Sequence, residues 1–202
     1  SASDVYKRQS EIWINSGSNI KYPKSFTANQ RLIYLEGEAY FSVKKDQAKP
    51  FIVKTKQLSV KVLGTKFNVK AYSDDENITT TLTNGKVEVS TQSQEKQILK
   101  PNEQLTYNIK TSEMNIENIS PAETDAWLTG QILFINSSFQ DIKQTLERHF
   151  NITIDDRSNI PASRLYTVKF LKGETLDEIL HVLKDVIGFT YQQQGTHIVL
   201  NK

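Results

Sequence analysis

Residues 31–45, RLIYLEGEAYFSVKK, alternate between apolar and polar side chains. Within residues 33–43 every apolar side chain stands at an odd number, and Gly37 completes the row: Ile33, Leu35, Ala39, Phe41 and Val43. Residues two apart in a β-strand point to the same side of the sheet, so this period predicts a strand with one buried face. The even-numbered residues are expected on the opposite, wetter face.

Further short runs rich in Val, Thr, Phe and Tyr follow at the spacing of sandwiches and barrels, and they predict strands at 51–55, 58–63, 66–72, 78–83 and 86–90. Asn84-Gly85 favours a tight type I′ hairpin between two of them. Gly64 predicts a corner or bulge. We therefore expect an all-β domain at residues 10–108, antiparallel and sandwich- or solenoid-like, with Phe41, Phe67 and Val69 facing inward.

The period changes in residues 131–202, where strand and helix patterns alternate. Superposing Phe139 on Leu176 also aligns Asp141 with Glu178, which indicates an internal repeat of about 37 residues. Thr175 and Glu178 form a capping box at the start of the second helix, and Gly188 is expected to end it. The prediction is a small α/β domain of duplicated βαβ units, with strands at 132–136, 151–154, 166–170, 189–192 and 197–201. Residues 109–130 show no clear period and are interpreted as a linker.

Composition excludes several classes of function. The chain has no cysteine, which removes thiol chemistry, disulfides and Cys-type zinc sites, and a net charge of +2 gives no reason to expect nucleic-acid binding. No second histidine follows His149, His181 or His197 at metal-ligand spacing, and phosphate-binding and nucleophile motifs are missing. No segment approaches 18 consecutive apolar residues. We expect no metal, no cofactor and no catalytic site.

Glu36 and Glu38 are the residues that keep an enzymatic alternative open. Residues two apart in a strand lie roughly 7 Å from each other, and the carboxyl pairs of glycosidases lie about 5–9.5 Å apart. Tyr34 and Tyr40 share the even-numbered side of the same strand, so a carbohydrate-binding or carbohydrate-processing sandwich is the alternative. Against it, a catalytic acid needs partial burial, whereas the period places both glutamates on the wet face.

Several stretches together resemble FecR-type proteins. They are EIWINSGSNIKYP, RLIYLEGEAYFSVKK, KPFIVKT, VKVLGTKFNVKAY, TTTLTNGKVEVS and LKPNEQLTY, in this order. The segment WLTGQILFINSSFQDIKQTLERHFNITI resembles the small domain that follows FecR in the versions from Bacteroides-like bacteria. Together these stretches cover about residues 10–202. Residues 1–9 differ from the family pattern, which would place a Pro-Asp-Gly turn before the strand of Trp13.

This resemblance implies the periplasmic sensor of an inner-membrane anti-sigma factor. Its all-β FecR domain would be followed by a domain similar to the secretin/TonB short N-terminal fold. The expected partner is the signalling domain of a TonB-dependent outer-membrane transporter, and the regulated protein is an extracytoplasmic-function sigma factor. The cytoplasmic anti-sigma domain, which would contact the sigma factor, and the membrane helix would lie outside this chain.

The predicted mechanism is recognition by strand addition. Two βαβ halves leave strand edges exposed, and an exposed edge is a template for a partner strand. The strands at 166–170 and 197–201 are the candidate edges, and the candidate partner-binding residues are Tyr166, Val168, Ile198 and Leu200. Plain core packing is the alternative for each of these side chains. A structural assembly subunit that binds only its own copies is a third hypothesis.

Overall fold

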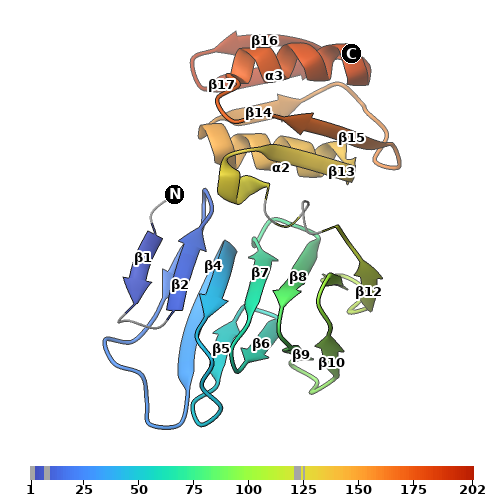
Figure 1. Ribbon diagram of the computed structural model, residues 1–202. Helices are drawn as coiled ribbons and strands as arrows, with labels where there is room; N and C mark the ends of the chain where they lie inside the picture. The colour runs from blue at the N-terminus through green and yellow to red at the C-terminus, as the bar shows by residue number, and fades with distance from the viewer. Residues whose placement is uncertain (1–2, 7–9, 121–123, 125) are drawn as a thin grey trace. The chain divides into compact units, whose positions relative to one another are not determined.

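The computed structural model describes residues 3–6, 10–120, 124 and 126–202 (Figure 1). Contacts along the chain divide it into two compact units, Ser1–Thr124 and Asp125–Lys202. The first is built of strands, and the second combines strands with helices. No helix among the described residues is long and apolar enough to cross a lipid bilayer.

In the first unit the described strands form one curled, 12-stranded sheet. Its main path runs β10-β9-β6-β5-β4-β7-β8-β11-β12, while β2 and β3 pair with β4, and β1 pairs with β2. The strands are β1 (Ser3–Tyr6), β2 (Ser10–Ile14), β3 (Asn19–Lys21), β4 (Arg31–Val43), β5 (Phe51–Lys54), β6 (Leu58–Val62), β7 (Lys66–Ala71), β8 (Asn77–Asn84), β9 (Val87–Thr91), β10 (Lys96–Leu99), β11 (Glu103–Asn108) and β12 (Met114–Asn118).

The long strand β4 belongs to both halves of this sheet. Its first residues pair with β3 and β5, and its last residues pair with β2 and β7. The odd-numbered residues of β4 are buried, as the period predicted. Phe41, Phe67 and Val69 are fully buried, and the rings of Phe41 and Phe67 stack with centroids 4.9 Å apart. A single row of side chains thus fixes the register of the sheet's centre.

Gly37 marks the change of partner along β4. Four residues, 15–18, lie opposite Gly37 and Glu38 between the ends of β2 and β3. Gly37 has φ +110°, and a Cβ added there would lie 2.4 Å from Ser18 Oγ. Only glycine fits this bulge without strain.

One expectation about this unit is wrong. Asn84-Gly85 does not close a hairpin, since β8 pairs with β7 and β11 whereas β9 pairs with β6 and β10. Gly85 alone of the two residues has positive φ, so the chain turns a corner between the halves of the sheet. Strand β12 lies inside the predicted linker 109–130 and pairs with β11, so this part of the segment extends the sheet of the first unit. Gly64 does lie at a corner, where a Cβ would meet Lys45 Cα at 2.4 Å.

The second unit contains two small sheets. β13 pairs antiparallel with β15, and β17 lies between β14 and β16. Each half has the order strand, helix, strand. β13, β14 and β15 pair with strands of the other half, whereas β16 pairs with β17 of its own half. The elements are η1 (Trp127–Thr129), β13 (Ile132–Ser138), α2 (Phe139–Phe150), β14 (Thr153–Asp156), β15 (Leu165–Phe170), α3 (Leu176–Leu183), η2 (Lys184–Gly188), β16 (Thr190–Gln194) and β17 (His197–Asn201).

Both helices of this unit begin with a capping box. Thr175 Oγ1 accepts the backbone N–H of Glu178, as predicted, and Ser138 Oγ accepts that of Asp141 in the same way. The last turn of the second helix widens into a π-helical turn, η2, that ends at Gly188 with φ +91°. The apolar faces of α2 and α3 share one core with residues of both small sheets.

Candidate functional site

The two glutamates of β4 do not form a matched acid pair. Glu36 is exposed opposite Asn19 of β3, whereas Glu38 is half-buried. Glu38 Oε2 accepts a hydrogen bond from Asn15 Nδ2 at 2.8 Å, and Oε1 accepts one from Asn68 Nδ2 at 2.8 Å. The carboxylate of Glu38 therefore ties β7 and the turn after β2 to β4, which is a structural role. It does not belong to a solvated face as the period suggested.

A second set of hydrogen bonds holds the bulge opposite Gly37. The backbone N–H of Glu38 donates to Ser18 Oγ at 2.8 Å, and Tyr72 Oη donates to the carbonyl of Ser16 at 2.7 Å. Both carboxylate oxygens of Glu38 and its N–H are thus committed to folding. This use of Glu38 leaves the glycosidase-like hypothesis without its second carboxylate.

Tyr34 and Tyr40 do not make one aromatic surface, contrary to the shared parity of their positions. Tyr34 is 51% exposed, while Tyr40 is 7% exposed. Trp13 is the register partner of Tyr40 on β2, and the two rings meet edge-on with centroids 5.7 Å apart. A neighbouring strand therefore covers one tyrosine and leaves the other open, which sequence parity could not reveal.

The candidate docking strands differ from each other. In the described part of the chain β15 pairs only with β13, so its second edge is open. The expectation of an edge at 197–201 is wrong, because β17 is parallel to β14 on one side and antiparallel to β16 on the other. Ile198 and Leu200 are fully buried in the core beneath it.

The side chains of β15 also divide into two rows. Tyr166 is buried and Val168 is half-buried, and both pack into the core of the second unit. Leu165 and Leu171, at the two ends of the strand, are 56% and 59% exposed, the highest values among the large apolar side chains of the described residues. The sequence analysis selected Tyr166 and Val168 as partner-binding residues, and both belong to the inward-facing row. The missed signal lies in residues 165–171, LYTVKFL. Its even-numbered residues are apolar and face the core, yet its odd-numbered row also begins and ends with a leucine.

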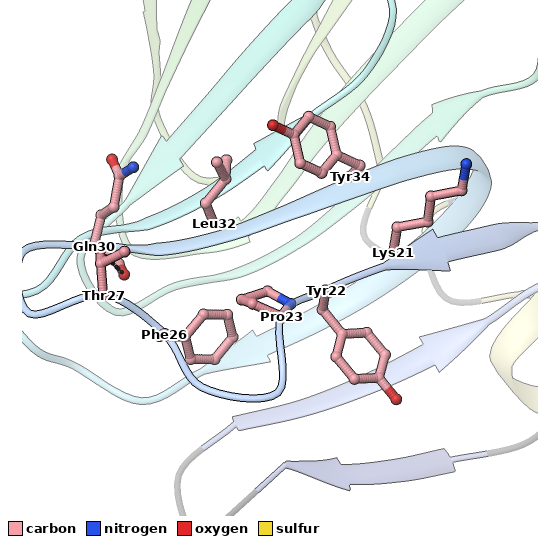
Figure 2. A pocket seen from close by; sticks show the side chains of 8 residues that line it. All are labelled: Lys21, Tyr22, Pro23, Phe26, Thr27, Gln30, Leu32 and Tyr34. Atoms are coloured by element: carbon pink, nitrogen blue, oxygen red, sulfur yellow. Dashed lines mark hydrogen bonds between the residues drawn. The ribbon is translucent and has the colours of Figure 1, made fainter.

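A cavity of about 440 Å³ opens in the first unit beside β4 (Figure 2). Leu32 and Tyr34 contribute from the strand, and Pro23 and Phe26 contribute from the loop of residues 22–30. No cluster of three potential metal ligands exists among the described residues. Sequence patterns gave no sign of this cavity, because a loop without a period builds one of its walls.

Comparison with known proteins identifies the family. The FecR protein model matches residues 3–88, and the model of the FecR C-terminal region matches residues 131–200. Two crystal structures of a protein assigned as an anti-sigma factor, from Parabacteroides distasonis ATCC 8503, are each 33% identical with a TM-score of 0.92. The alignments cover 100% of this chain and 94% and 93% of those chains. No curated protein matches.

The chain therefore belongs to the FecR family, as the sequence motifs predicted. The regulatory class of its relatives agrees with the expectation of a signalling protein rather than an enzyme.

Proposed function

We propose that this chain is the periplasmic sensor of a transmembrane anti-sigma factor. It binds the signalling domain of a TonB-dependent outer-membrane transporter and thereby regulates an extracytoplasmic-function sigma factor. The observation that carries the proposal is the full-length similarity to a protein assigned as an anti-sigma factor, together with the two FecR matches.

The proposal includes the fold of the second unit and the domain division. Residues 131–202 form a domain similar to the secretin/TonB short N-terminal fold, built by duplication of a βαβ unit. Two strand–helix–strand segments in succession, each with a capping box, support this assignment. In this division residues 10–108 form the FecR domain, and 109–130 join it to the second domain.

The open edge of β15 is the docking element we favour. An edge strand offers unpaired N–H and C=O groups, so an extended partner segment gains main-chain hydrogen bonds by adding to it. Leu165 and Leu171 give that partner apolar contacts at both ends of the strand, while Tyr166 and Val168 hold the strand on its core. The proposed partner-binding residues are thus Leu165 and Leu171 on the outer face, with Tyr166 and Val168 acting through the backbone.

In the first experiment, the signalling domain of a TonB-dependent transporter encoded nearby is titrated into the chain, and the heat of binding is measured. A Leu165→Asp/Leu171→Asp variant should lose at least about tenfold in affinity, which corresponds to about 1.4 kcal/mol. The matched control is Val182→Asp/Val186→Asp, since these valines are also exposed in the second unit, at 43% and 48%. Equal affinities for both variants would reject the outer face of β15.

Proline scanning separates the backbone contribution. Successive N–H groups of a strand point to opposite sides, so one of Thr167 and Val168 donates toward β13 and the other toward the open edge. One proline variant should weaken the partner without loss of stability, and the other should lower the stability of the second unit. Normal partner affinity for the stable variant would argue against strand addition, and self-association without a transporter partner would favour the assembly hypothesis.

A further inference from the structure

The cavity beside β4 combines aromatic, amide and basic groups at one place in the first unit. Its lining comprises Lys21, Tyr22, Pro23, Phe26, Thr27, Gln30, Leu32 and Tyr34. Figure 2 shows Pro23 and Phe26 in the loop across from Leu32, with the rings of Tyr22 and Tyr34 at the rim and directed away from each other. Its volume of about 440 Å³ lies within the range of small-molecule sites, roughly 300–1,000 Å³.

The walls of this cavity are anchored. Arg31, between Gln30 and Leu32, is 8% exposed and donates from Nε to the carbonyl of Lys49 at 2.9 Å. On the loop side Phe26 packs against the core of the first unit, and Thr27 Oγ1 donates to the carbonyl of Gln30 at 3.2 Å. A ligand would therefore meet a surface whose shape is set by the fold.

The charge around the cavity is positive. Lys21 of β3 and Lys54 of β5 are the register partners of Tyr34 on its two sides, so the three side chains share the outer face of the sheet. Neither lysine forms an ion pair within the residues that the structure describes. Glu36, two residues along β4 on the same face, reduces the local charge without cancelling both ammonium groups.

We propose that this cavity binds an acidic saccharide, a sugar that bears a carboxylate or sulfate. The exposed ring of Tyr34 offers a flat apolar face to the C–H groups of a pyranose. Lys21 and Lys54 attract its anionic group, and the carboxamide of Gln30 bonds its hydroxyls. A hollow of about 440 Å³ accommodates a sugar ring, whereas an extended peptide needs an open strand edge or a long groove.

The test is a binding assay by isothermal titration with the whole chain. The probes are trisaccharides of galacturonate, glucuronate and galactose sulfate, with neutral galactose trisaccharide and a triglutamate peptide as comparisons. At least one acidic sugar should bind, and its affinity should fall as salt is raised from about 0.05 to 0.5 M, because the contribution of exposed charges is screened. Neutral sugar and peptide should bind at least about tenfold more weakly.

Two variants locate the site. Tyr34→Ala and Lys21→Glu/Lys54→Glu should each weaken the acidic sugar by about tenfold or more, a loss of about 1.4 kcal/mol. Lys86→Glu is the charge control, because Lys86 is exposed, does not line the cavity and, unlike Lys21 and Lys54, is not a register partner of Tyr34. Circular dichroism confirms that each variant is folded. The proposal is overturned if no acidic sugar binds, if the folded variants bind as well as the control, or if the peptide binds as tightly as the sugars.

Discussion

The two units of this chain differ in how the edges of their strands are paired. In the first, β4 passes through both halves of one continuous sheet, and its neighbours β2, β5 and β7 each have a second partner strand. In the second, the core is shared between two helices and two small sheets, and β15 keeps an open edge with exposed leucines at its ends. The difference is that β4 has partner strands on both sides, whereas β15 has one on a single side among the described strands.

The largest effect on stability should come from a substitution in the core of the first unit. Phe41→Ala removes a fully buried ring that stacks on Phe67, so it should lower the stability of the first unit by about 3–5 kcal/mol. Denaturation followed by hydrogen exchange in both units measures it. If the second unit loses the same protection, the two units are one cooperative body and the comparison fails.

Gly37 should be nearly as sensitive. Gly37→Ala places a Cβ 2.4 Å from Ser18 Oγ at φ +110°, and the strain should cost about 2–3 kcal/mol. Gly195→Ala in the second unit is the matched control, since its φ is also positive, at +59°, but no atom lies within 4 Å of the added Cβ. Urea unfolding of both variants gives the difference. Similar losses would show that the bulge is not tightly packed.

Glu38 and Glu36 should respond differently to the same change. Glu38→Gln replaces one of the two acceptor oxygens with an NH₂ group, which cannot accept the hydrogen bond of Asn15 or Asn68. We expect the stability of the first unit to fall by about 1–3 kcal/mol. Glu36→Gln should stay within about 0.5 kcal/mol of the wild type because its side chain is exposed. Chemical denaturation measures both. A large loss for Glu36→Gln alone would reverse the roles assigned to these residues.

The smallest effect concerns the pH response of the second unit. The backbone N–H of Thr175, and then its hydroxyl, donate to the Glu178 carboxylate and lower its pKa below the ordinary 4.5. The unfolded chain therefore binds this proton more tightly, so the stabilisation is present above about pH 4.5 and is lost as the pH falls through the lower folded pKa.

Thermal unfolding of the second unit should therefore depend less steeply on pH in Glu178→Gln, between about pH 5 and 3, than in the wild type. Glu174→Gln, which lies outside the capping box, serves as the control. An identical pH slope in the wild type and Glu178→Gln would show that the cap does not hold this charge.

How much the sequence revealed depended on the range of the interaction. The alternation of 33–43 predicted the buried face of β4, and the Thr175–Glu178 pattern predicted a helix start, because both signals are local. Asn84-Gly85 misled, since the partners of β8 and β9 are set by strands distant in the sequence. The alternation in HIVLN, residues 197–201, is expected both for an edge strand and for a strand with two neighbours. The sequence therefore could not reveal that β17 lies between β14 and β16.

The candidate sites follow the same rule. FecR membership could be predicted from the ordered motifs. The half-buried Glu38, in contrast, depends on Asn68 of β7 and on Asn15 in the turn after β2. The exposure of Leu165 depends on which row of β15 the helices cover. The cavity at Tyr34 needs the loop of residues 22–30 in place.

The most direct measurement follows amide hydrogen exchange in the chain as the transporter's signalling domain is added. Strand addition predicts new protection of alternate amides in β15 between Leu165 and Phe170, and unchanged exchange in the already paired β17. Binding that leaves β15 unprotected, with protection confined to other strands, would contradict recognition through the open edge of the second unit.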